Sequence, residues 1–276
     1  MTPSPDDAGP SASPEDHAAI CDGELTVIGR IRSASNATFL CEVPGTSGDS
    51  VHCVYKPVRG ERPLWDFPDG TLAGREVATY LISAALGWNV VPYTVLRDGP
   101  AGVGMVQRWI HEPELAEGAL DLVDICLPQA VPQDYLPILR ALDADGAEIV
   151  LVHADDALLR RMAVFDTLVN NADRKGGHIL RGADGGVYGV DHGICLHGED
   201  KLRTVLWGWA GKPVEPELLD DVTRLEESLR GDLGAALATH ITMAEVTAVR
   251  LRAVMMLNEP VMPMPDRNRP IPWPAF

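Results

Sequence analysis

Residues 170–180 read Asn-Asn-Ala-Asp-Arg-Lys-Gly-Gly-His-Ile-Leu, and residues 188–193 read Tyr-Gly-Val-Asp-His-Gly. This pattern predicts an acid in a loop, then a short hairpin, then a second acid at the end of a strand. Asp173 and Asp191 would then converge on one point. Two carboxylates held in this way can orient a hydroxyl nucleophile and hold a magnesium ion, which phosphoryl transfer from ATP requires. The alternative is a pair of ordinary turn aspartates beside glycines.

The residues before this stretch predict a β-rich first half. Short β-branched or alternating runs at 25–31, 37–43, 51–58, 93–97 and 103–109 are typical of strands. A polar turn at 59–71 leads to residues 72–86, whose apolar residues have helical spacing. Gly87 follows that helix directly, as a C-terminal glycine does.

The second half is predicted to be mainly helical. Residues 154–171 place Leu158, Leu159, Met162, Phe165 and Leu168 on one face, and further helices are expected at 217–230 and 243–257. Short strands are expected at 178–181 and 187–190. A β-rich lobe followed by an α-rich lobe, with both acids just past the first large helix of the second lobe, predicts an α+β, two-lobed, protein-kinase-like fold.

Composition sets the boundaries and excludes several classes of protein. Residues 1–19 are rich in Pro, Ser, Ala and acid, and are expected to be disordered. An ATP-binding N-lobe at 20–110 and a catalytic C-lobe at 111–258 would follow, then a proline-rich tail at 259–276 that lies on the body through Trp273 and Phe276. The 276-residue chain has a net charge of −17, which argues against nucleic acid as a partner.

Cysteine usage and hydropathy predict a cytoplasmic protein. The five cysteines are widely spaced and form no C-x-x-C pair, so a disulfide framework or a zinc finger is not expected. The acidic start has no apolar segment of the kind found in signal peptides. No apolar run is long enough to predict a transmembrane segment.

Lys56 and Glu76 are the candidate pair for binding the ATP phosphates. Lys56 ends the third predicted strand, and Glu76 lies twenty residues later inside the following helix. A lysine–glutamate pair between that strand and that helix positions the lysine in kinases. The alternative is a surface lysine, together with a solvated helix face that Glu76 shares with Arg75.

Two further segments could contact the nucleotide. Ser33, Ser35 and Asn36 lie in the link between the first two strands, where small residues let backbone N–H groups approach phosphates. An ordinary hairpin turn has the same composition. Gln107 lies where a hinge between the lobes is expected, and the backbone there could bind adenine.

These motifs resemble those of a known family. Residues 172–178 resemble the D-R-H-x-x-N catalytic loop of phosphatidylinositol 3- and 4-kinases and their bacterial relatives, and residues 191–193 resemble their D-F-G. The separation of 18 residues between Asp173 and Asp191 is also similar. From about Leu25 onward, the chain resembles an actinobacterial phosphatidylinositol 3-/4-kinase-like family. The resemblance implies ATP, magnesium, a two-lobed kinase fold, Lys56 on phosphate and Asp191 on the metal.

Two departures from the family pattern concern the metal. Lys175 replaces the loop histidine, and His178 replaces the asparagine that would bind a second magnesium ion. Neutral imidazole binds divalent cations but prefers softer ions than Mg²⁺, so Mn²⁺ is an alternative. A different site, with His192 and His197 joining His178 and Asp191 around a transition metal, would instead indicate a phosphoesterase.

The sequence thus predicts an ATP-dependent phosphotransferase in which Asp173 orients or deprotonates a hydroxyl acceptor. The acceptor could be a lipid headgroup, a protein or a small metabolite. The alternatives are an inert ATP-binding pseudokinase that regulates a partner protein, and a protein nucleotidyltransferase. Residues 201–212 combine three basic residues with Trp207 and Trp209. They could grip an anionic substrate or a membrane interface, or they could pack the tryptophans into the core.

Overall fold

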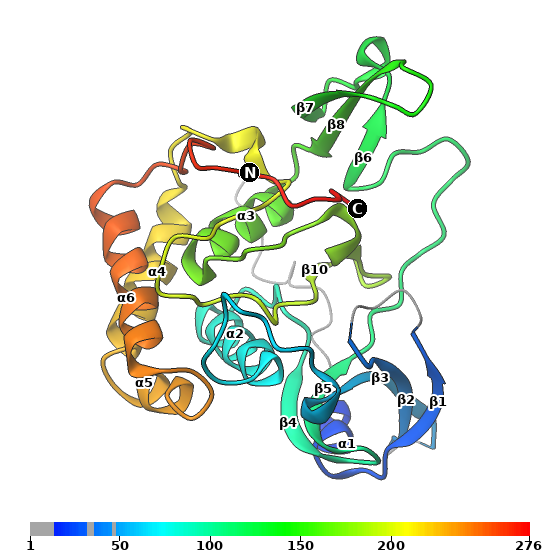
Figure 1. The fold of residues 1–276 in the computed structure, drawn as a ribbon, viewed down its shortest axis with the longest axis vertical. Coiled ribbons are helices and arrows are strands. Elements are labelled where there is room, and N and C mark those ends of the chain that lie inside the picture. The colour runs from blue at the N-terminus through cyan, green and yellow to red at the C-terminus, as the bar shows by residue number, and fades with distance from the viewer. Residues whose placement is uncertain (1–13, 32–35, 46–47) are drawn as a thin grey trace, which may run out of the picture.

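The computed structural model describes residues 14–31, 36–45 and 48–276. The predicted two-lobed α+β fold is confirmed in these residues. Figure 1 shows an antiparallel sheet at the lower right and a helical lobe on the left, with helix α2 between them. No helix among the described residues is both long enough and apolar enough to cross a lipid bilayer.

The N-lobe is built on a five-stranded antiparallel sheet in the order β1-β2-β3-β5-β4. Its strands are Thr26–Arg30, Phe39–Pro44, Ser50–Pro57, Thr94–Gly99 and Gly102–Arg108 for β1 to β5. Side chains alternate between the two faces of a strand. Because Cys53, Tyr55 and Pro57 are buried on one face of β3, Lys56 must point to the other face, toward the cleft between the lobes.

The prediction that residues 1–19 are disordered is wrong for the last residues of that segment. Pro14–Asp22 form helix α1, which lies against the sheet in Figure 1. Ala19 and Ile20 are buried there with Cys41, Cys53 and other residues of the sheet. The low hydropathy of residues 1–19 as a whole concealed the helix, which is ordered by the burial of Ala19 and of Ile20 just beyond that range.

Helix α2, Leu72–Leu86, joins the two lobes. It begins at its N-cap Thr71, whose Oγ1 accepts a bond from Gly74 N at 2.9 Å, and it ends at Gly87, whose φ of 68° is left-handed. Ala73 and Val77 contact Met105 of the sheet. The opposite face, with Ala78, Ile82 and Leu86, belongs to the core of the C-lobe.

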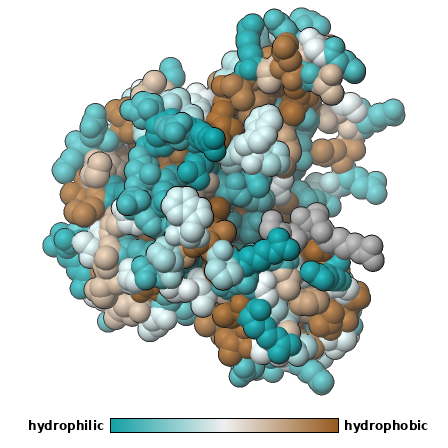
Figure 2. All heavy atoms as spheres, in the orientation of Figure 1, coloured by the Kyte–Doolittle hydropathy of each residue, from teal (hydrophilic) through white to brown (hydrophobic). Residues whose placement is uncertain are grey.

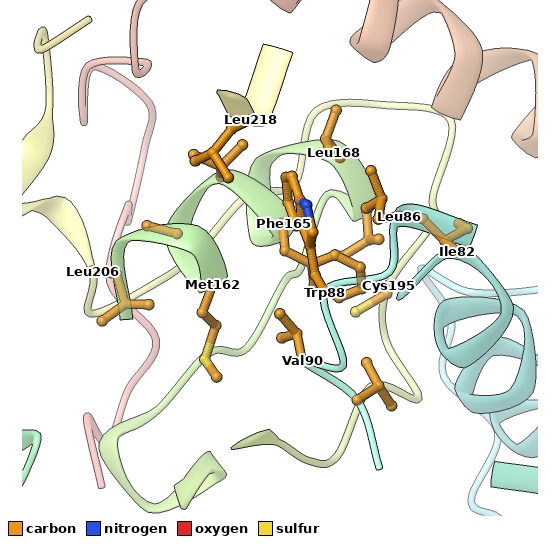
Figure 3. Packing of buried hydrophobic residues seen from close by; sticks show 14 of the residues in the cluster. Ile82, Leu86, Trp88, Val90, Met162, Phe165, Leu168, Cys195, Leu206 and Leu218 are labelled. Carbon is orange, nitrogen blue, oxygen red and sulfur yellow. The ribbon is translucent and has the colours of Figure 1, made fainter. Parts of the chain in front are cut away.

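The C-lobe packs its helices around one large core. Its helices are Ala157–Val169, Pro216–Ser228, Asp232–Leu237 and Met243–Asn258 for α3 to α6, and its short hairpin is Ile179–Arg181 and Val187–Gly189 for β9 and β10. In Figure 3, Phe165 and Leu168 of α3 meet Trp88 and Leu86 from the end of α2. This core holds the hairpin and the loop that precedes it.

The prediction of a mainly helical second half missed a second sheet. Val123–Cys126, Tyr135–Leu142 and Glu148–Ala154 form β6, β7 and β8, in the order β6-β8-β7. Helix α3 consequently begins only after Asp156, whose Oδ1 accepts bonds from Leu158 N and Leu159 N. Figure 2 shows apolar side chains on this protruding sheet, where Leu139 and Leu142 are exposed.

The proline-rich tail lies on the C-lobe, but Trp273 does not anchor it. Backbone bonds join Met262 O to Gly211 N and Pro270 O to Thr204 N, whereas Trp273 is 84 % exposed. Trp207 and Trp209 are buried. The packing alternative for residues 201–212 is therefore the correct one for these two tryptophans.

Candidate active site

Lys56 is held by two carboxylates at the mouth of the cleft. Its Nζ lies 2.6 Å from Glu76 Oε1 and 2.8 Å from Asp191 Oδ1, and its side chain is 20 % exposed. Burial acts to lower the pKa of Lys56, but Asp191 and Glu76 together outweigh it and raise the pKa above the usual value for lysine. The ammonium therefore stays charged, and the Lys56–Glu76 pairing expected from the sequence is present in the structure.

Glu76 connects helix α2 to the loop that carries the second acid. Its Oε1 accepts from Lys56, and its Oε2 accepts from the backbone N–H of His192 at 3.1 Å. The side chain is 2 % exposed, so both bonds lie away from water. One carboxylate thus positions both the lysine and the backbone next to Asp191.

Asp191 combines an unusual backbone with a charged side chain. Its φ is 61°, a left-handed conformation that non-glycine residues seldom adopt and that clusters at functional sites. The ammonium of Lys56 holds the pKa of Asp191 well below its usual range, although burial opposes this effect. Half of the side chain is exposed, so the carboxylate remains accessible from the cleft.

His178 presents an unprotonated nitrogen to Asp191. Its Nδ1 lies 2.8 Å from the carbonyl oxygen of Asp173, which can only accept, so Nδ1 carries the hydrogen. Burial lowers the pKa of His178, so the ring is neutral near pH 7. Its Nε2 lies 3.4 Å from Asp191 Oδ2. A lone pair beside a carboxylate, with the other ring nitrogen on a carbonyl, is a common arrangement of metal ligands.

Asp173 lies on the loop before β9 and is paired with Lys175. Its Oδ2 lies 3.0 Å from Lys175 Nζ, and its backbone N–H donates to Asn171 Oδ1. The lysine that replaces the histidine of the family pattern therefore holds one oxygen of the acid. The side chain of Asp173 is about a quarter exposed, so it can be reached from the cleft.

A buried ion pair inside the C-lobe supports this loop. Arg174 and Asp166 are both fully buried, and Arg174 Nη2 lies 2.9 Å from Asp166 Oδ1. Arg174 also donates to the carbonyl oxygens of His178 and Val190 and contacts His192 Nε2 at 2.7 Å. It therefore joins the loop of the first acid to the strand that ends at the second.

Four of these charged side chains line one cavity of about 400 Å³ between the lobes, whereas His178 is not part of its wall. Lys56, Glu76, Asp173 and Asp191 all contribute to its wall, and so does Asn36. The volume lies within the range of small-molecule sites. The convergence of the two acids is the arrangement expected from the sequence.

The remaining predicted nucleotide contacts have different outcomes. Ser33 and Ser35 lie outside the described residues. Gln107 does not reach the cavity: it is buried within β5, and its Nε2 donates to Thr94 Oγ1 at 2.8 Å. Residues 105–107 pair with β3 and β4 on either side, so they form the middle of the sheet rather than a hinge.

The alternative transition-metal site is not formed. His192 is buried against Arg174, and His197 contacts the ring of Phe67. In the described part of the chain, no three His, Cys, Asp or Glu side chains cluster as metal ligands would. The assignment of Asp191 and His178 as ligands stays a prediction, and an ion held by these two would take its other ligands from phosphates and water.

Several residues of the site were missed from the sequence. Glu61 and Arg62 line the cavity from the loop between β3 and α2, which had been interpreted only as a polar turn. Asp166 was overlooked although it lies between Phe165 and Leu168 on an apolar helix. A charged residue on the apolar face of a helix indicates a buried partner of opposite charge. Arg174, eight residues later, is that partner.

Comparison with solved structures gives distant matches. A golgi casein kinase aligns at 13 % identity with a TM-score of 0.48, covering 88 % of this chain and 75 % of that one. A hydra Fam20 structure with sugar aligns at 14 % and 0.49, covering 87 % and 86 %. The proinflammatory kinase CtkA of Helicobacter pylori aligns at 11 % and 0.36, covering 86 % and 97 %. The two-lobed assignment rests on the chain's own elements.

Sequence comparison gives one much closer relative. No family model matches the chain, so the resemblance to phosphatidylinositol kinases stays a prediction. Protein Rv2133c of Mycobacterium tuberculosis (strain ATCC 25618 / H37Rv) is 62 % identical over 268 residues, which cover 95 % of this chain and 96 % of that protein. The chain therefore belongs to the same family as protein Rv2133c.

Proposed function

We propose that the protein is an ATP-dependent phosphotransferase that moves the γ-phosphoryl group of ATP to a hydroxyl acceptor. The observation that carries the proposal is the position of Lys56 Nζ, 2.6 Å from Glu76 and 2.8 Å from Asp191, in the cavity that Asp173 also lines. A lysine oriented by a helix glutamate, a second acid beside it and a third group for the acceptor are the parts that phosphoryl transfer uses.

Lys56 would bind the phosphates of the nucleotide, and Glu76 would keep it in place. The charge on Lys56 is secured by its two carboxylate partners. Because Glu76 also binds His192 N, the lysine and the Asp191 loop share one support. This arrangement favours a site that is organised before the nucleotide enters, which lowers the cost of ordering it on binding.

Asp191 and His178 would hold a divalent cation. Such a cation neutralises charge on the β- and γ-phosphate oxygens when it is bound. The carboxylate suits Mg²⁺, whereas the neutral imidazole suits a softer ion such as Mn²⁺. Activity with both metals, and a stronger preference for Mn²⁺ than an all-oxygen site would have, is therefore part of the proposal.

Asp173 would act on the acceptor. Its carboxylate would accept the hydroxyl proton while the hydroxyl oxygen bonds to the γ-phosphorus and the bond from that phosphorus to the bridging oxygen of ADP breaks. Lys175 holds Asp173 Oδ2, which leaves Oδ1 for the acceptor. The resemblance to phosphatidylinositol kinases makes an inositol-lipid headgroup the first acceptor to test, ahead of protein hydroxyls and small metabolites.

The experiment is ATP turnover with purified protein, Mg²⁺ or Mn²⁺, and a panel of acceptors that includes phosphatidylinositol vesicles. ATP carrying a γ-phosphate label should give ADP and a labelled acceptor. Release of AMP and pyrophosphate would instead indicate nucleotidyl transfer. Metal-dependent ATP binding without turnover on any acceptor would favour the pseudokinase alternative.

A pair of lysine variants controls the experiment. Lys56→Met should lose ATP binding, because it removes the cation that Glu76 and Asp191 hold in the cavity. Lys212→Met is the matched control, since Lys212 is exposed and does not line the cavity. Equal ATP affinity in the wild type and in both variants would refute the assignment of the site.

A further inference from the structure

We propose that Arg62 is a second phosphate-binding side chain of the cavity and grips the terminal phosphates of the nucleotide. The proposal rests on the proposed function and adds a residue that the family motifs do not contain. Arg62 lies in the loop between β3 and α2, six residues after Lys56. It lines the cavity that holds Lys56, Asp173 and Asp191.

Within residues 14–31, 36–45 and 48–276, the other charges of the cavity all have partners and leave Arg62 unpaired. Of the six charged side chains that line it, four are carboxylates: Glu61, Glu76, Asp173 and Asp191. Glu76 and Asp191 bind Lys56, Asp173 binds Lys175, and Glu61 accepts two backbone N–H groups. Among the residues that the structure describes, none forms a hydrogen bond or an ion pair with the guanidinium of Arg62, which is exposed.

The backbone at Arg62 is held against the cavity wall. Glu61 Oε2 accepts from Leu72 N at 2.9 Å, and Glu61 Oε1 accepts from Ala73 N at 2.8 Å, which ties the loop to the first turn of α2. The backbone N–H of Arg62 donates to Asn36 Oδ1 at 3.0 Å. The base of the side chain is therefore positioned on two sides, while its guanidinium has no hydrogen-bond partner within the described part of the chain.

A triphosphate needs more positive charge than Lys56 supplies. Lys56 is the only other cation of the cavity wall in the described residues, and it already neutralises two carboxylates. Phosphate oxygens would also lie near four acids, which repel them. A guanidinium matches the geometry of phosphate with two parallel N–H donors and keeps its charge at any working pH. Arg62 is the residue placed to supply this contact.

The test compares nucleotide affinities by titration calorimetry of Arg62→Ala and Arg59→Ala with ATP, ADP and AMP, in Mn²⁺. Arg59 is exposed on the same loop and does not line the cavity, so it is the matched control. Arg62→Ala should weaken ATP binding about 10-fold or more, the effect expected for charge-assisted hydrogen bonds to phosphate. AMP affinity should not change, and Arg59→Ala should behave as the wild type.

The variants separate this inference from the proposed function. Wild-type protein that binds none of the nucleotides would refute the proposed function and this inference with it. Wild-type binding that is unchanged in Arg62→Ala, or weakened equally for ATP and AMP, would refute the role of Arg62 alone. Arg62→Lys should recover part of the affinity, because it restores the positive charge but not the two parallel N–H donors. A thermal melt of each variant should match that of the wild type, since the guanidinium forms no hydrogen bond or ion pair with the described residues.

Discussion

Asp166→Asn tests whether the loop of Asp173 depends on the ion pair beneath it. Both oxygens of Asp166 are used: Oδ1 accepts from Arg174 and Asn171, and Oδ2 accepts from Arg174 and Thr204. The amide has almost the same shape as the carboxylate. It removes the negative charge and directs an N–H group at one of these donors, so Arg174 becomes a buried cation without a counter-ion.

The expected loss of stability follows from the burial. Removing one partner of a buried ion pair costs about 3–5 kcal/mol. Arg174 keeps the carbonyl oxygens of His178 and Val190, so the lower value of about 3 kcal/mol is expected. A surface pair gives the comparison: Asp200 is 60 % exposed and binds Arg267, so Asp200→Asn should cost less than about 1 kcal/mol.

Urea denaturation of the wild type and the two variants measures the difference. With a denaturant slope of about 3 kcal/mol per molar, Asp166→Asn should lower the midpoint by about 1 M, whereas Asp200→Asn should lower it by a third of that or less. The loop should also loosen, so turnover should fall even where the variant is folded. Equal midpoints for the two variants would show that the buried pair does not stabilise the fold.

Three further predictions concern the site and a buried histidine. Asp173→Ala should keep nucleotide affinity but lose roughly 10²-fold or more in turnover, because the acid acts on the acceptor; unchanged turnover would exclude that role. His178→Asn should shift the metal preference from Mn²⁺ toward Mg²⁺, measured as ATP affinity in each metal, and an unchanged preference would contradict the ligand assignment. Burial lowers the pKa of His153 to about 4 from 6.5. The unfolded chain thus binds the extra proton between these values, and stability should fall by at most about 3 kcal/mol as pH drops from about 6.5 to 4. His153→Gln should flatten that part of the urea-midpoint profile, and a slope equal to that of the wild type would refute the assignment.

Local patterns were enough to predict the elements that carry the site. Residues 72–86 form a helix with the bounds expected, because apolar spacing and Gly87 act within the segment. The pairing of Lys56 with Glu76 was predicted because kinases place such a pair on that strand and on the helix that follows it. Asp173 and Asp191 were placed together by the short hairpin between them.

The features missed depend on distant parts of the chain. The strands of the β6-β8-β7 sheet are ordered by pairing with each other, and an apolar run such as Ile149–Val152 fits a buried helix as well as a central strand. Gln107 was placed at a hinge from its position alone, whereas its burial is set by Thr94 on the neighbouring strand. The exposed guanidinium of Arg62 was recognisable only once the partners of every nearby acid were known.

Helix α2 has a consequence for how the protein could be switched on and off. Its two faces belong to two hydrophobic clusters, with Val77 against the sheet and Ile82 and Leu86 inside the C-lobe. Rotating the helix away would expose several apolar side chains, at a cost of about 1.5–3 kcal/mol for each large one. The Lys56–Glu76 contact is therefore expected to persist whether or not a nucleotide is bound. Activity would then be controlled by access of the nucleotide and the acceptor to the cavity, because the Lys56–Glu76 pair stays formed.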